Sequence, residues 1–451
     1  MGNEIYPLVK DFADFLKTKL DEALENGKVE TRIIGKEVFK WEIKNFDYSV
    51  EKGIISHEAS GIQNSIEIPV FIHEVDEQIK LTDEYKKLIE ELSKRSVIQN
   101  LENKMMIFIR KINSVYLREK EIPEQMLSIF IKELKGEPIK MWVDVELFGL
   151  TLEPDEINIT SEITLKKPTK KYLEREKTIS LFNQDNISLE YPSAILRIDI
   201  LGKSPIDLQK QIERTITILR LFGSGGVKYI KYESFSEGVI TFCGAVSRPF
   251  DTRKSNQSYP IYNKDVARLK KFFGEISDIL PLRFESYKNL DDNLNLGFSY
   301  QRYTEAILQN ELTEKRIVNT ISGLESLYSN STQELSRHLR ISIGNFMGLF
   351  GYDAYEVRKK IKDSYDIRSK FIHGNHLDYN SKKVFIEKHG SLENLFSYVV
   401  DYLRISIVLF LALGMGKDQF IDLLEDILID DKKKENFKIQ IENIKEKFGL
   451  N

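Results

Sequence analysis

The last third of this sequence is patterned almost wholly as α-helix, and its most apolar stretch limits what the chain can build. Residues 391–413 form an apolar run of helical length, in which Asp401 and Arg404 interrupt the pattern just before the uniform segment 405–413. That uniform segment is too short to cross a bilayer, which takes about 20 residues. We therefore expect residues 391–413 to form the central helix of a soluble bundle.

Other helices are predicted around this central one, because apolar residues recur at three- and four-residue spacing. Ser331, Thr332 and Glu334 form an N-cap pattern at the start of one of them. Residues 374–390 are predicted to be a loop, and a Lys- and Glu-rich helical segment follows the central helix. The predicted helices before that loop span residues 298–308, 314–328, 331–350 and 353–365.

Before residue 298 the apolar pattern changes repeatedly between the helical and the strand period, with turns expected near Gly53 and Gly61. The helices predicted here are 8–26, 76–98, 101–134 (divided near Pro123), 205–221 and 263–279. The predicted strands are 37–43, 65–72, 139–148, 194–201, 227–232 and 239–246.

The predicted fold class is therefore α+β, with a mixed α/β N-terminal region followed by an all-α helical bundle. The polar, turn-rich segment 285–298 marks the expected boundary between them. We expect an α+β region at 1–136, a β-rich α+β region at 137–290 and a helical domain at 298–451. The first two regions alternatively form one unit.

Charge and cysteine content exclude several classes of protein. A net charge of −4 with 30% charged residues excludes a generally basic coat for nucleic acid, so that any nucleic-acid contact is expected to be local. Cys243 is the one cysteine, which excludes an intramolecular disulfide and a cysteine-based metal cluster. The N-terminal residues lack the pattern of a signal peptide. These features predict a cytoplasmic protein without a membrane partner.

Residues 365–374 carry the strongest chemical signal, since they resemble a helix end stopped by Gly374 and contain Arg368 and His373. Imidazole transfers protons near neutral pH, and guanidinium binds phosphate while permanently charged. Five helical residues turn through about 500°, so that Arg368 and His373 lie about 140° apart, whereas Ser369 shares the face of His373. One Arg and one His supply half of what RNA cleavage without metal requires. Two copies across a two-fold interface would supply a full composite site.

An architectural reading of the same residues stays open. A histidine near a helix C-terminus is favoured by the helix dipole alone. Side chains that are buried and salt-bridged would indicate architecture, whereas side chains in a cleft shared by two protomers would indicate catalysis.

Several nearby residues have two readings. Tyr365 could stack on a base, although we favour packing beneath the motif. Glu325 could tune the motif histidine electrostatically or lie on a solvated helix face, and neither reading is preferred. His338, Arg337 and Arg340 could line an RNA groove, although a polar helix face is the interpretation that we favour.

Two patterns suggestive of ligand sites are weak. His376 and His389 follow His373 closely, but no carboxylate or cysteine lies at metal-ligand spacing, so that we predict no metal and no other cofactor. The glycines of residues 223–226 do not form a phosphate loop, because Val227 follows where a lysine is required. We expect them to end a helix.

Four segments in the C-terminal third together resemble the ApeA-like branch of the HEPN superfamily. In that branch, a helix with a Gly-Leu-Glu sequence precedes a second helix. The second helix ends in the motif Tyr-x-x-Arg-Ser-x-x-x-His-Gly, in which x is any residue. The matching segments are 323–327, 334–343, 361–365 and 368–374, and the resemblance covers about residues 298–415.

The resemblance implies a helical bundle that dimerises through its motif helices and cleaves single-stranded RNA or tRNA loops without metal. The expected products carry a 2′,3′-cyclic phosphate and a 5′-OH. Arg368 and His373 carry over as catalytic residues, with Ser369, Tyr365 and Glu325 in support.

The biological role implied is that of a toxin or abortive-infection effector in antiviral defence against phage, with a phage-derived or neighbouring-gene activator. The alternative is a non-catalytic HEPN module that binds nucleotide, RNA or a protein partner.

Overall fold

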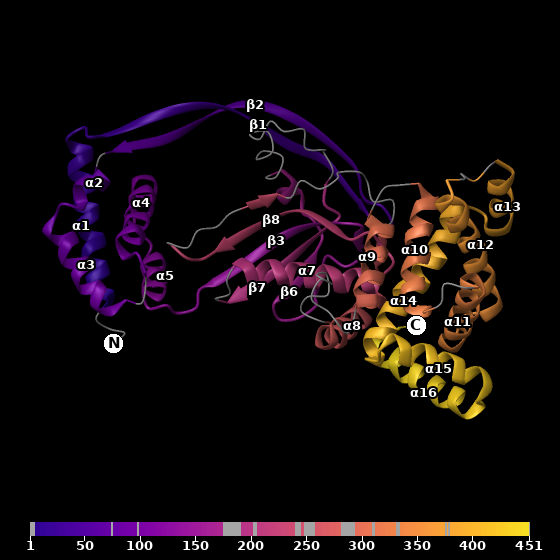
Figure 1. The fold of residues 1–451 in the computed structure, drawn as a ribbon. Coiled ribbons are helices and arrows are strands. Elements are labelled where there is room, and N and C mark those ends of the chain that lie inside the picture. The colour runs from indigo at the N-terminus through magenta and orange to yellow at the C-terminus, as the bar shows by residue number, and fades with distance from the viewer. Residues whose placement is uncertain are drawn as a thin grey trace.

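The computed structural model describes most of the chain and shows an elongated molecule (Figure 1). A group of helices near the N-terminus lies at one end, a sheet lies in the middle, and the helical C-terminal region lies at the other end. The predicted fold class is confirmed: a mixed α/β region with an antiparallel sheet precedes an all-helical region. The described residues are 5–73, 75–96, 99–174, 191–201, 205–239, 245–247, 258–280, 294–308, 312–330, 334–374, 377 and 379–450.

The N-terminal helices enclose a hydrophobic core of their own, to which Phe108 and Phe130 contribute rings stacked at 3.6 Å. The single helix predicted at 76–98 is wrong, because Thr82 caps a new helix: its hydroxyl accepts from the backbone N–H of Tyr85. The division near Pro123 is confirmed. The helices are α1 (Ile5–Glu25), α2 (Val75–Ile79), α3 (Asp83–Arg95), α4 (Leu101–Glu119) and α5 (Glu124–Leu134).

A long antiparallel ribbon extends from these helices to the sheet (Figure 1). Its strands are β1 (Val29–Ser49) and β2 (Gly53–His73), each roughly 70 Å long at the usual rise per residue. The predicted strands 37–43 and 65–72 fall inside it. A turn at Gly61 is wrong, since Gly61 pairs with Trp41 within the ribbon.

The tip of the ribbon is fastened to strand β4 (Leu150–Leu152) by Tyr48 and by the hydroxyl of Thr151, which donates to the backbone carbonyl of Val50. The hydroxyl of Tyr48 accepts from the backbone N–H of Leu152 at 2.8 Å and donates to the carbonyl of Ser193 at 2.9 Å. Burial raises the pKa of Tyr48 to about 12, which keeps the hydroxyl protonated as a donor.

The central sheet has six strands in the order β5-β6-β7-β3-β8-β9, and α7 (Pro205–Phe222) lies along one face. The strands are β3 (Lys140–Phe148), β5 (Glu156–Asn158), β6 (Ile163–Lys166), β7 (Ala194–Leu201), β8 (Lys228–Ser236) and β9 (Ala245–Ser247). The strand predicted at 239–246 overlaps β9, and residues 240–244 lie outside the described parts. A short parallel pair joins β4 to β10 (Tyr259–Ile261).

The glycines after α7 end that helix, as predicted, and lie beneath an aromatic ring. A Cβ atom at Gly223 or Gly225 would lie 2.7 Å or 2.3 Å from the ring of Tyr259. The hydroxyl of Tyr259 donates to the carbonyl of Leu219 at 2.7 Å. These residues therefore need to be glycine for packing rather than for binding phosphate.

The C-terminal region is helical, and α12 contains most of the motif stretch. The N-cap pattern at Ser331 and Thr332 and the boundary residues 285–293 lie outside the described residues. A turn of 3₁₀-helix, η1 (Asn263–Asp265), precedes α8. The helices are α8 (Val266–Ile279), α9 (Leu294–Leu308), α10 (Thr313–Tyr328), α11 (Leu335–Phe350), α12 (Ala354–Ile372), α13 (Tyr379–His389), α14 (Leu392–Leu413), α15 (Lys417–Ile429) and α16 (Asp431–Phe448).

The loop predicted at 374–390 is wrong, because α13 occupies most of it. Phe385 is buried, whereas its neighbours Val384 and Ile386 are 46% and 47% exposed. Three consecutive apolar residues, of which one is buried, do not show the three- and four-residue spacing of a helix. The apolar pattern therefore did not predict this helix.

Helix α14 runs through the helical region as predicted for its central helix. By length and composition it could cross a membrane, but 72% of its most apolar window is buried inside the protein. Such burial is typical of the core helix of a bundle. The buried residues include Leu403 and Leu409, neither of which is exposed.

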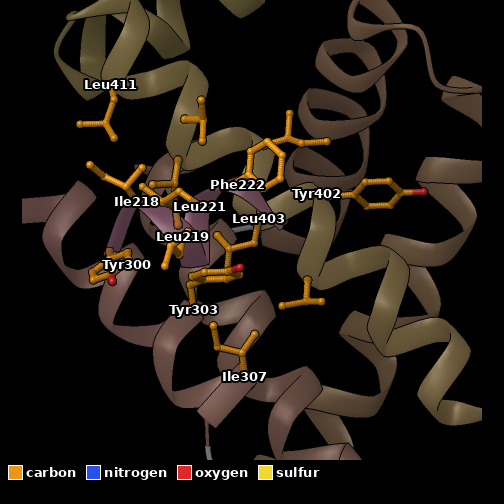
Figure 2. Packing of buried hydrophobic residues seen from close by; sticks show 14 of the residues in the cluster. Ile218, Leu219, Leu221, Phe222, Tyr300, Tyr303, Ile307, Tyr402, Leu403 and Leu411 are labelled. Carbon is orange, nitrogen blue, oxygen red and sulfur yellow. The ribbon is translucent and has the colours of Figure 1, made fainter. Parts of the chain in front are cut away.

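One hydrophobic core continues from the sheet into the helical region, and Figure 2 shows where the two meet. Polar groups reinforce this junction. Arg404 donates to the carbonyls of Leu221 and Phe222 at the end of α7, at 2.8 and 3.3 Å, and pairs with Asp401 at 2.7 Å. The side chains labelled in Figure 2 come from α7, α9 and α14: Ile218, Leu219, Leu221, Phe222, Tyr300, Tyr303, Ile307, Tyr402, Leu403 and Leu411. The division into regions at 136 and 290 stays a prediction.

Two helical glycines are expected to respond oppositely to alanine. A Cβ at Gly323 would lie 2.8 Å from a methyl of Leu403 on α14, so that Gly323→Ala overpacks the core and costs about 1–3 kcal/mol. Gly274, in α8, has no neighbour among the described residues within 4 Å of such an atom. Gly274→Ala is expected to stabilise by up to about 1 kcal/mol through helix propensity. Urea unfolding of both variants measures this, and shifts in the same direction would contradict the packing described here.

Candidate functional site

The motif residues lie where α10, α11 and α12 pack together. Helices α11 and α12 run antiparallel, since Gly344 faces Arg358 and Gly348 faces Ala354. A Cβ at Gly344 would lie 2.3 Å from Cγ of Arg358, and one at Gly348 would lie 3.0 Å from Cβ of Ala354. The absence of these side chains lets the two helices approach closely.

Both ends of α12 are defined by local chemistry. Asp353 caps its start by accepting from the backbone N–H groups of Tyr355 and Glu356 at 2.9 and 3.0 Å. Gly374 follows its end with a φ of +74°, a left-handed conformation that favours glycine. The predicted stop at Gly374 is therefore confirmed, and it places His373 at the C-cap.

Arg368 forms an ion pair with Glu325 of α10, in which Nη2 lies 2.7 Å from Oε2. The two side chains are 20% and 14% exposed. Burial raises the pKa of the Glu325 carboxyl, and the charge of Arg368 opposes part of that rise. Nε of Arg368 and Oε1 of Glu325 are buried and have no hydrogen-bond partner in the described parts of the chain.

Of the two readings of Glu325 from the sequence, the solvated helix face is wrong, because its side chain is 14% exposed, whereas electrostatic tuning of His373 stays a prediction. Its carboxylate is neither on a solvated face nor hydrogen-bonded to His373, but holds Arg368. The two residues are 43 positions apart, and nothing in the local sequence marks them as partners. A contact of this kind depends on how α10 packs against α12.

Tyr365 packs against the hydrophobic core with its ring half-buried. The Cζ atom of Arg368 lies 5.6 Å from the centre of this ring, which adds a cation–π contact to the ion pair. This position agrees with packing beneath the motif, the reading favoured from the sequence. Tyr365, Glu325 and Arg368 thus form one cluster.

His373 lies outside that cluster and is exposed at the end of α12. Within the described residues, no hydrogen bond or ion pair reaches its imidazole. The backbone carbonyl of Ser369 accepts from the backbone N–H of His373 at 3.3 Å, so the tie between these two residues is a helical one. Arg368 meets the architectural criterion of a buried, salt-bridged side chain, and His373 does not.

Another histidine, His389, differs from His373 in that its side chain is buried beside α12. Nε2 of His389 lies 2.9 Å from Oδ2 of Asp363, and Nζ of Lys388 lies 3.4 Å from Oδ1. These contacts fasten the end of α13 to α12, so that His389 is a helix residue rather than the predicted loop residue. His376, the other member of the weak metal pattern, lies outside the described residues. Within the described chain, no group of three or more His, Cys, Asp or Glu residues is placed to hold a metal.

Known proteins do not identify this site. No family model matches the sequence, and neither a curated protein nor a solved structure matches the chain. The resemblance to HEPN domains therefore rests on the motif residues and stays a prediction.

Proposed function

We propose that this chain is a metal-independent endoribonuclease of the HEPN type, which cleaves single-stranded RNA or tRNA loops. The observation that carries the proposal is the exposed imidazole of His373, at a helix end one turn beyond the guanidinium of Arg368. An imidazole that is open to solvent can meet a large substrate, and imidazole is a side chain suited to proton transfer near neutral pH. In this proposal the enzyme acts in the cytoplasm as an antiphage, abortive-infection effector.

The chemistry proposed needs proton transfer and charge stabilisation. The 2′-oxygen attacks phosphorus as its proton is removed, and the bond from phosphorus to the 5′-oxygen breaks as that oxygen gains a proton. The products are a 2′,3′-cyclic phosphate and a 5′-OH. His373 of each of two protomers supplies one of the two proton transfers. Arg368 stabilises the negative charge that develops on the phosphate.

A non-catalytic HEPN module that binds nucleotide, RNA or a protein partner is the second candidate. The ion pair between Arg368 and Glu325 favours it, because the carboxylate already neutralises the guanidinium on which the chemistry would depend. In a nuclease, the incoming phosphate has to compete with Glu325 or use the remaining donors of Arg368.

The purified full-length chain should therefore cleave RNA in the presence of EDTA. We expect end-labelled tRNA or single-stranded RNA to yield fragments that mass spectrometry identifies as carrying 2′,3′-cyclic phosphates. The chain should also be expressed in bacteria during phage infection, so that a phage-derived activator is present when RNA cleavage is measured. Intact RNA in every condition, together with equal binding of RNA by the wild type and His373→Ala, would favour the binding module.

A further inference from the structure

Arg340 is a half-buried cation on α11 without an ion pair or hydrogen bond among the described residues. Its Nε is buried and has no acceptor in the described structure. It precedes Gly344 and Gly348 at four-residue steps, which places it on the face of α11 that packs on α12. A buried guanidinium N–H without an acceptor is uncommon in folded proteins, so Arg340 is a candidate for binding an anion that the described chain does not supply.

The antiparallel packing directs Arg340 towards Arg368. Gly348 lies level with Ala354 and Gly344 with Arg358, so Arg340 lies level with about residue 362. Arg368 is then about 9 Å farther along the axis of α12. Side chains in a helix lean towards its N-terminus, and in antiparallel neighbours these directions are opposite. Arg340 and Arg368 therefore lean towards one another.

The charges at this place do not balance. Among the described residues, the carboxylate that pairs with either guanidinium is that of Glu325, which Arg368 holds through Oε2 while Oε1 is buried without a donor. The Nε donors of Arg340 and Arg368 are both buried without acceptors in the described chain. Guanidinium donors bind phosphate oxygens in charge-assisted pairs, so that a phosphodiester would supply both the missing charge and the missing acceptors.

We propose that Arg340 and Arg368 together form a binding site for a phosphate of single-stranded RNA, at the seam between α11 and α12. This assignment rests on the proposed function, since the same Arg368 serves the proposed cleavage. Arg340 binds the RNA backbone, and it adds a cation that Glu325 does not neutralise.

Binding of a fluorescent 2′-O-methyl RNA oligonucleotide tests the site, because this probe lacks the 2′-OH and resists cleavage. Arg340→Gln is expected to weaken binding about tenfold, the value of one charge-assisted contact. The slope of log K against log salt should fall in magnitude by about 0.7, the value for one phosphate of a single strand. Arg340→Lys keeps the charge, so it should retain the salt slope while binding about two- to threefold more weakly.

Arg337→Gln is the matched control, since Arg337 lies one turn earlier on α11, is exposed and pairs with Glu334 at 3.3 Å. We expect less than a twofold change in RNA binding for this variant. Equal affinities of wild type, Arg340→Gln and Arg337→Gln would overturn the assignment, as would loss of the salt slope in a folded Arg340→Lys protein. If the wild-type protein binds RNA in a manner that depends on Arg340 but never cleaves it, the proposed nuclease activity is refuted whereas the phosphate site is supported.

Discussion

Replacing His373 by alanine is expected to lower RNA cleavage by about 10²–10⁴-fold, the usual contribution of a group that transfers protons in the transition state. Stability should change by less than about 0.5 kcal/mol, because the imidazole is exposed and makes no hydrogen bond or ion pair within the described residues. Initial cleavage rates and the unfolding temperature of the same preparation measure both effects. Loss of activity without loss of stability separates a chemical role from an architectural one.

His338→Ala is the matched control for this experiment. His338 is exposed on α11, the helix that packs against α12, and it has no role in the proposed chemistry. Its cleavage rate should stay within about twofold of the wild type. If His373→Ala and His338→Ala cleave equally well, His373 is a surface residue and the proposed nuclease loses its general acid or base.

Arg368→Met is expected to cost about 2–4 kcal/mol of unfolding free energy at pH 7, besides the loss of cleavage. Removing one partner of a mostly buried ion pair leaves the other charge without compensation, and here Glu325 is 14% exposed. The methionine keeps an unbranched apolar chain at this position beside Tyr365, whose ring centre lies 5.6 Å from Cζ of Arg368. Urea unfolding followed by circular dichroism provides the measurement.

The pH dependence of this variant distinguishes a lost charge pair from lost packing. Burial raises the folded-state pKa of Glu325 above its unfolded value, so the folded state binds more protons and the carboxylate lowers stability as pH rises through that interval. Without Arg368 the pKa rises further. The cost of Arg368→Met should therefore shrink when the pH falls towards 4.5 and Glu325 becomes protonated.

The double variant Glu325→Gln/Arg368→Met provides the control, because it removes both charges. It should be more stable at pH 7 than Arg368→Met alone and should lose the difference between pH 7 and pH 4.5. A cost of Arg368→Met that is the same at both pH values would show that Glu325 does not carry the effect.

The sequence predicted those parts of the fold whose signals are local. Helix α14 is apolar enough to be recognised directly, and the end of α12 follows from Gly374. Helix α13 escaped prediction because one apolar residue, Phe385, packs inward and leaves no period to read. The full length of the ribbon was also missed, since Gly61 looks like a turn residue and is instead paired across two strands.

The sequence supplied a list of residues for the candidate site, whose role stays a prediction, but it did not supply their arrangement. Arg368 and His373 were both recognised from their types and their distance from a helix end. Their environments differ, because Arg368 faces α10 and His373 projects beyond the last turn. That difference arises from helix packing between residues far apart in sequence, of which a single sequence contains no direct record.

The junction at Arg404 limits how such a chain can be recombined. Its guanidinium holds the last carbonyls of α7, and the hydroxyl of Tyr303 donates to the carbonyl of Arg220 at 2.7 Å. If residues 298–451 were fused to an unrelated N-terminal region, Arg404 and Tyr303 would lose the backbone carbonyls of α7 that accept their hydrogen bonds. A replacement N-terminal region would therefore need a helix end that offers carbonyl acceptors in the same positions. The region that precedes the helical domain is for this reason not freely exchangeable.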